Sequence, residues 1–212
     1  MGGITGETIG QAKFEELVTR HEKYLTEMRG QDFTSDERIA LSKCVLVDVS
    51  IERRALVAAT FAGCRFVDFH ARDCDLNGVD FYENFAEVSC YFERCNFHKA
   101  ELNDSNLTGA NLAGSGFTRA DLTGVVLFRA NLAGCKFDWA WLIDADLRFA
   151  NLEGASFVGT RFRHTRMYNN RPFLLEARKG AMNYYSNEDI DLSEAGDLSE
   201  LGGVDLLDRL KR

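Results

Sequence analysis

Proline is almost missing from this chain of 212 residues, which has one proline against 18 glycines. It also has no apolar run of the roughly 18 residues that a membrane helix needs, and its first residues lack the basic and apolar regions of a secretory signal. These absences predict a cytoplasmic protein with no membrane partner. Scarce proline beside abundant glycine favours a continuous hydrogen-bonded backbone with many tight turns, and therefore internal repeats.

A large apolar residue recurs every five residues through most of the chain. The column runs from Leu41 to Phe81, slips by one residue, and continues from Phe92 to Met167. It has 25 positions, of which 22 are Leu or Phe. Because Leu and Phe make up only 39 of the 212 residues, chance does not produce such a column.

A second column of small residues lies two positions before the first. It holds Ala, Cys, Ser, Thr or Val in 22 of 25 cases, the exceptions being Ile39, Arg54 and Phe69. Asp or Asn often lies between the two columns, and Gly recurs two positions after the large residue. A period of five fits neither a helix nor a flat strand. It fits a chain that turns a corner every five residues, so that four corners close a square coil and successive coils stack.

This unit, A-(D/N)-(L/F)-x-x, resembles the repeat of the pentapeptide-repeat family, and the match covers residues 39–169. The resemblance implies an all-β solenoid, a right-handed quadrilateral β-helix with about 20 residues in each coil. At roughly 4.8 Å per coil, the six and a half coils would make a rod about 30 Å long.

An open end of a solenoid exposes strand edges, so both ends need caps. We assign residues 1–38 to an N-terminal helical cap and expect a capping box formed by Thr8 and Gln11. The helix is expected to stop at Gly30. Its apolar stripe consists of Phe14, Leu17, Val18, His21, Leu25 and Met28.

Residues 170–212 are assigned to a C-terminal helical cap or a dimerisation tail. Pro172 is expected to open a second amphipathic helix. An acidic stretch, 188–200, precedes an apolar tail that either closes the last coil or pairs with a second copy. The resemblance implies a possible homodimer, since members of the family commonly dimerise through their C-terminal ends. The interface residues would then be Leu206, Leu207 and Leu210.

The cysteines and histidines form no catalytic or metal-binding pattern. All six cysteines fall in the small inward column, where Cys replaces Ala as a compact apolar residue. The histidines are scattered, without a nucleophile or carboxylate at a useful offset. The glycines of 109–114 have the spacing of a phosphate-binding loop, but no Lys follows them. The sequence therefore predicts no enzyme, no cofactor and no metal site. The cysteines are Cys44, Cys64, Cys74, Cys90, Cys95 and Cys135.

The one-residue slip lies within residues 82–91. A structurally harmless bulge and a partner-binding loop both fit this pattern. Tyr82 and Phe85 would be unusual residues to leave in water, so they are candidate partner-binding residues.

Positions 20 apart stack on one face of such a solenoid, which predicts an outward ladder of aromatic residues and arginines near the C-terminal end of the array, with Trp139 and Trp141 on the adjacent faces. These residue types dominate binding hot spots. Either another protein covers the cluster or residues 170–212 fold back over it. The candidate residues are Phe128, Arg129, Trp139, Trp141, Arg148, Phe149 and Tyr168.

We predict a non-catalytic scaffold that binds another protein, with no direct contact to nucleic acid. The resemblance implies an alternative, because Qnr-type quinolone-resistance proteins of this family mimic DNA, bind DNA gyrase or topoisomerase IV and protect it from inhibitors. Two features depart from that type. The slip is a single residue rather than a longer loop, and residues 39–169 carry 16 acidic and 14 basic residues. A DNA mimic needs rows of negative charge, and a nucleic-acid binder needs a basic stripe.

Overall fold

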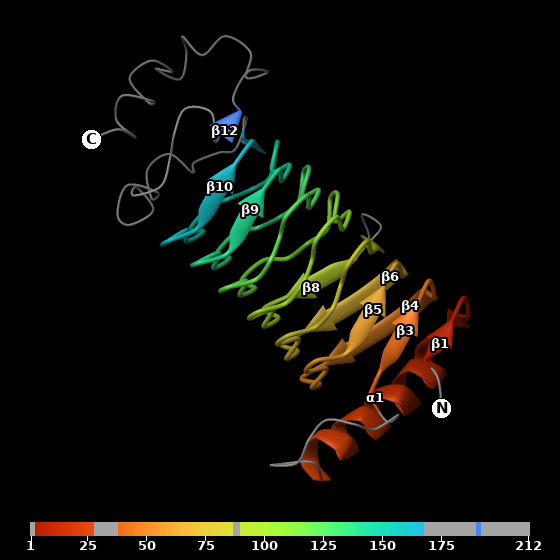
Figure 1. Cartoon of the computed structure of the whole chain (residues 1–212). Helices are drawn as coiled ribbons and strands as arrows, with labels where there is room; N and C mark the ends of the chain where they lie inside the picture. Colours follow the sequence, from red (N-terminus) through yellow and green to blue (C-terminus); the bar gives the residue numbers. More distant parts are fainter. Residues whose placement is uncertain (1–2, 28–37, 87–89, 168–189, 192–212) are drawn as a thin grey trace.

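The computed structural model describes residues 3–27, 38–86, 90–167 and 190–191, which form a helix and a parallel β-solenoid (Figure 1). The N-terminal part contains β1 (Ile4–Thr5), β2 (Thr8–Ile9) and α1 (Gln11–Glu27). The remaining strands, in chain order, are β3 (Ala40–Ser42), β4 (Val45–Glu52), β5 (Thr60–Ala62), β6 (Arg65–Arg72), β7 (Phe85–Ala86), β8 (Tyr91–Glu93), β9 (Trp141–Ile143), β10 (Arg161–Arg163), β11 (Thr165–Arg166) and β12 (Ile190–Asp191).

Successive coils pair in parallel with an offset of 20 residues. Strand β4 lies beside β6 with Val45 opposite Arg65, and isolated bridges join Asn111 to Asn131 and Asn131 to Asn151. Backbone hydrogen bonds lie one residue to either side of this pairing; the amide of Leu112, for example, donates to the carbonyl of Asn131 over 2.9 Å, and the amide of Asn131 donates to the carbonyl of Ala110 over 2.9 Å. Four units of five residues therefore make one coil, and the predicted all-β solenoid is confirmed.

Each corner is closed by a residue with a left-handed backbone. All 24 described residues that lie two positions after a large inward residue have φ between 48° and 72°. Eight of them are glycines, for which this region costs nothing. The other 16 include bulky residues such as Trp139 and Phe149, for which it costs about 1 kcal/mol. The geometry of the corner thus explains why glycine recurs there without being required.

The Asp and Asn residues between the two columns stabilise the corners. The side-chain oxygen of Asn111 accepts a hydrogen bond from the amide of Ala113 over 3.2 Å, and Asn131 does the same for Ala133. This local bond fixes the turn. In addition, the Asn131 amide donates to Asn111 of the neighbouring coil over 3.0 Å. The polar position therefore has a structural role.

The core consists of the two inward columns. On one side of the coil four phenylalanines stack with ring centroids 4.9 to 5.0 Å apart. Phe69, an exception in the small column, is buried two residues before Ala71, which is buried at a large position. The large and small side chains have exchanged places there, so the filled volume is kept. The stacked rings are Phe97, Phe117, Phe137 and Phe157.

The slip lies between Ala86 and Tyr91. Phe66 pairs with Ala86 at an offset of 20, whereas His70 pairs with Tyr91 at an offset of 21. Asn84 and Ala86 are both buried, at the small and the large inward position of one further unit. Our column of 25 positions missed this unit because its residues do not match the pattern. Residues 87–89 are outside the described part of the chain.

Helix α1 lies across the N-terminal end of the solenoid (Figure 1). Its buried residues are Phe14, Leu17, Val18, His21 and Tyr24, so the expected stripe is correct in its first four members. The capping box is wrong. Thr8 belongs to β2, which pairs with β4, and the Gln11 amide instead hydrogen-bonds both backbone groups of Ser50. Strands β1 and β2 thus add backbone partners to the first coil.

Arg54 occupies the small column because it joins the solenoid to α1. Its guanidinium donates to the Glu22 carboxylate over 2.8 Å and also contacts Glu15. Partial burial opposes ionisation of Glu22, but the hydrogen bonds from Arg54 and the Ala55 amide hold its pKa below the usual value. These charge-assisted bonds fix the helix over the first coil.

At the other end, β12 pairs in parallel with β11, with Thr165 opposite Ile190. The chain therefore supplies a further backbone partner after the last unit of the solenoid. The expected C-terminal helix at Pro172 and the tail leucines Leu206, Leu207 and Leu210 lie outside the described residues.

Candidate partner-binding surface

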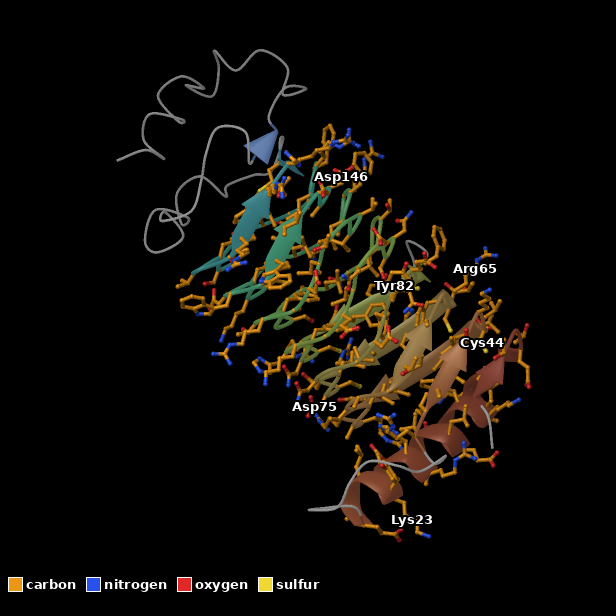
Figure 2. All side chains as sticks on the ribbon, viewed as in Figure 1. Lys23, Cys44, Arg65, Asp75, Tyr82 and Asp146 are labelled. Carbon is orange, nitrogen blue, oxygen red and sulfur yellow. The ribbon has the colours of Figure 1, made fainter. Side chains whose placement is uncertain are left out.

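Exposed large apolar residues form two groups along the solenoid. Tyr82, Phe85 and Tyr91 flank the slip and are 41 to 42% exposed. The other group lies in the last coils and is 43 to 58% exposed. Figure 2 shows the separation: Tyr82 lies near the middle of the solenoid, and Asp146 lies toward its C-terminal end. The second group consists of Trp139, Trp141, Phe149 and Val158.

The structure brings four predicted residues together, which we call the Phe128 cluster: Phe128, Arg129, Arg148 and Phe149. The two rings meet edge to face with centroids 5.4 Å apart. The guanidinium carbons of Arg129 and Arg148 lie 5.0 and 5.5 Å from the Phe128 centroid. These distances are typical of cation–π contacts.

Asp146 holds Arg148 in place. The Arg148 Nε donates to Asp146 Oδ1 over 2.8 Å, and Nη2 donates to Oδ2 over 2.7 Å. Asp146 is 9% exposed, so its carboxylate oxygens have little contact with water and bind Arg148 instead. No pattern in the sequence indicates this role of Asp146, which occupies an ordinary Asp/Asn position of the repeat.

The remaining predicted residues lie elsewhere. Trp141 is on a neighbouring face, where the Arg161 guanidinium lies 5.6 Å from its ring. Trp139 is on another corner and covers Gly159, where an added Cβ would lie 2.8 Å from the indole. Tyr82 donates a hydrogen bond to Glu83 over 2.9 Å. Tyr168 is outside the described residues, as are the tail leucines.

Charged residues are unevenly distributed among the faces of the solenoid, although the array as a whole carries nearly equal numbers of acidic and basic residues. We call the side that contains Trp141 the Trp141 face. It is built from the stacked segments 40–44, 60–64, 80–84, 101–105, 121–125, 141–145 and 161–165. Its central segments carry Asp80, Glu83, Glu101, Asp104 and Asp121.

The described part of the chain also has a hollow that the sequence did not indicate. Its volume is about 340 Å³. Arg72 and Glu93 approach within 3.3 Å, and the rings of His70 and Tyr91 meet edge to face at 4.7 Å. Two of the charged side chains that line the hollow, Arg72 and Glu93, thus pair with each other. The lining residues are Ser50, Ile51, Glu52, His70, Ala71, Arg72, Tyr91 and Glu93.

The six cysteines are buried inside the coils. Burial raises the pKa values of Cys64 and Cys135 to about 12. The hydrogen bond between Cys74 and Cys95 lowers the pKa of Cys74 and raises that of Cys95. Of these four thiols, Cys74 alone has a lowered pKa. Across the described residues no group of three or more His, Cys, Asp or Glu is arranged to hold a metal ion.

No helix within the described ranges is both long and apolar enough to cross a membrane.

These features define a class of protein: a parallel β-solenoid of five-residue units with an exposed surface of aromatic residues and arginines. The family model for pentapeptide repeats matches residues 90–127 and 130–167. Together with the observed coils, this match shows that the C-terminal part of the solenoid consists of pentapeptide repeats.

Solved structures of this fold resemble the chain at low identity. A trypsin-treated variant of QnrB1, a plasmid-mediated fluoroquinolone resistance protein, has 17% identity and a TM-score of 0.37 and covers 95% of each chain. HetL, which is involved in regulating heterocyst differentiation in the cyanobacterium Nostoc sp. strain PCC 7120, has 20% identity and a TM-score of 0.30, covering 60% of this chain and 70% of its own. A pentapeptide-repeat protein from the Arabidopsis thaliana thylakoid lumen has 19% identity and a TM-score of 0.25, covering 65% and 82%. No curated protein matches the sequence.

Proposed function

We propose that this protein is a non-catalytic scaffold that binds another protein through the Phe128 cluster. The observation that carries the proposal is the packing of two aromatic rings and two guanidinium groups on the outside of a rigid solenoid. An exposed apolar patch calls for an explanation, and aromatic residues with arginine are the usual hot-spot residues.

The cluster is ordered before any partner arrives. Asp146 fixes Arg148, and Phe149 projects from a corner held by coil stacking. Side chains already held in place lose less conformational entropy on binding, so more of the contact energy contributes to affinity.

The test is a double variant, Arg129→Ala with Phe149→Ala, in a binding assay with proteins captured by the unmodified chain. We expect an affinity loss of roughly tenfold or more at an unchanged melting temperature. Arg148 is unsuitable for this purpose, because its removal would leave the buried Asp146 unpaired. Trp139→Ala is the matched control on another corner. Normal binding by the double variant would exclude the cluster.

A second candidate function is binding to DNA gyrase or topoisomerase IV with protection from quinolone-type inhibitors. The stacked acidic residues of the Trp141 face, Asp80, Glu101 and Asp121, favour this candidate. A basic DNA-binding surface attracts a row of carboxylates on one side of a rod. A cytoplasmic location, which we predict from the sequence, would give access to such a partner.

This candidate is tested by adding the purified chain to a gyrase supercoiling assay with and without a fluoroquinolone. The candidate predicts inhibition of supercoiling or relief of drug-induced cleavage, which Glu101→Gln with Asp104→Asn should weaken. Asp138→Asn with Glu153→Gln is the control for charge on other faces. An assay unchanged by the protein would dismiss this candidate and leave the Phe128 cluster proposal standing.

A further inference from the structure

The Trp141 face carries opposite charges on separate coils. Its three central segments, 80–84, 101–105 and 121–125, contain five carboxylates and no basic residue. Its last segment contains Arg161, Arg163 and His164 and no acidic residue. Between the acidic and basic parts lie Trp141, which is 45% exposed, and Ile143, which is partly buried.

The carboxylates form a ladder in register. Bridges join Asp80 to Glu101 and Glu101 to Asp121, and neighbouring strands are about 4.8 Å apart. Asp80 accepts a hydrogen bond from the Tyr82 amide, and Asp121 from the Thr123 amide. Within the described ranges none of the five carboxylates forms an ion pair. Stacked like charges repel, so a surface of opposite charge placed against this ladder would lower its energy.

The basic end lacks counter-charges in the same way. Arg161 lies against the Trp141 ring, and no described carboxylate pairs with Arg161 or Arg163. His164 and Asp144 approach within 3.1 Å, so these two residues already have each other. The carboxylates and the two arginines without ion pairs therefore lie on the same face, and their nearest members, Asp121 and Arg161, are two coils apart.

We propose that two copies of this chain associate through their Trp141 faces in antiparallel orientation. A two-fold axis between segments 121–125 and 141–145 places Arg161 and Arg163 of each copy opposite Glu101 and Asp104 of the other. It also places Trp141 opposite segment 121–125, where Gly124 adds no side chain to the interface. A two-fold interface repeats each contact, so one surface satisfies both copies.

A second copy fits this face better than a basic protein does. A basic partner would satisfy the acidic segments but would place like charge against Arg161 and Arg163, which costs binding free energy. A second copy matches both ends and buries the exposed Trp141 between them. This interface is separate from an end-to-end dimer through the C-terminal leucines.

The test compares association of the full chain and two charge-reversal variants by sedimentation equilibrium. The acidic variant carries Arg161→Glu and Arg163→Glu, and the basic variant carries Glu101→Lys and Asp104→Lys. We expect the unmodified chain to dimerise, more weakly at high salt, and each variant alone to be monomeric. An equimolar mixture of the two variants should dimerise again, because each then presents the charges that the other lacks. Lys99→Glu with Arg119→Glu applies the same charge change to another face and should dimerise normally.

Several results would overturn the proposal. They are a monomeric unmodified chain up to near-millimolar concentration, a dimer that persists in both charge variants, or a mixture that stays monomeric. A dimer lost on changing Leu206, Leu207 and Leu210 to Asp, but kept in the charge variants, would assign the interface to the tail. An effect on gyrase that needs Glu101 and Asp104, with no self-association, would assign the acidic segments to a basic partner.

Discussion

At the scale of single residues, His21 links the helix to the first coil. It is fully buried, its Nδ1 accepts a hydrogen bond from the Ile39 amide over 3.1 Å, and its Nε2 lies 3.1 Å from the Val57 carbonyl oxygen. These partners require the neutral ring with a proton on Nε2, because Nδ1 must accept. Burial lowers the pKa of His21, and the positive charge of Arg38 adds to this effect.

The folding free energy should therefore depend on His21 below neutral pH. The pKa of His21 is lower in the folded chain than its value of about 6.5 in the unfolded chain. The stabilisation is then complete above about pH 6.5 and is lost as the pH falls toward the folded-state pKa, because the unfolded chain takes up the proton first. Urea unfolding at about pH 7.5 and about pH 5.5 should show a lower midpoint in acid.

His21→Gln supplies the comparison, because glutamine does not titrate. This variant should start less stable and lose much less stability over the same pH interval. A variant with the same acid loss as the unmodified chain would show that other groups cause it.

At the scale of the repeated element, the phenylalanine stack stabilises each coil through its neighbours. Phe117 lies 4.9 Å from Phe97 and 5.0 Å from Phe137, measured between ring centroids. Phe117→Ala removes contacts on both sides and leaves a cavity that the rigid corners cannot close, so we expect a loss of about 3–5 kcal/mol in the free energy of unfolding. Denaturant unfolding measures it. Thr118→Ala, the next residue and partly exposed, should cost less than about 1 kcal/mol; a similar loss for both would contradict the stacking argument.

The five-residue unit was readable from the sequence because each unit repeats the same physical requirement: one large and one small side chain inside. The unit at Asn84 and Ala86 was missed because Asn84 is a polar residue at the small inward position and Ala86 is a small residue at the large inward position. The capping box failed because Thr8 could join a strand of the first coil, a long-range partner that local patterns do not show.

The candidate surface was predictable in part, for a related reason. An offset of 20 correctly placed Phe128 beside Arg148, since stacking follows from the period alone. The support from Asp146 and the segregation of charge on the Trp141 face were not foreseen. Both depend on which faces the outward positions occupy, and a count of charges over the array averages over all four faces.

At the scale of the whole molecule, each coil contacts mainly the coils on either side, so complete coils should be removable. Deleting residues 106–125 joins Ser105 to Val126, which restores the same sequence of corners. We expect a folded, shorter solenoid with slightly lower stability, measured by circular dichroism and thermal unfolding.

Deleting residues 106–115 instead should also leave both inward columns in period, but it removes half a coil. The later segments then turn by two corners, which moves Arg161 to the side opposite Glu101. This variant should fold and fail to self-associate. Loss of folding in both deletions would contradict the view that coils are independent units.

The offset of 20 residues between coils, corrected for the one-residue slip between Ala86 and Tyr91, assigns every outward residue to a face and a coil. Before the slip, stacked residues have numbers that differ by multiples of 20. For a residue beyond the slip, one is first subtracted from its number, and the same rule then applies. A surface residue can thus be moved to another side, or raised by one coil, by transplanting its five-residue unit. A binding group can therefore be placed on a chosen face and coil of the solenoid surface while the inward residues stay the same.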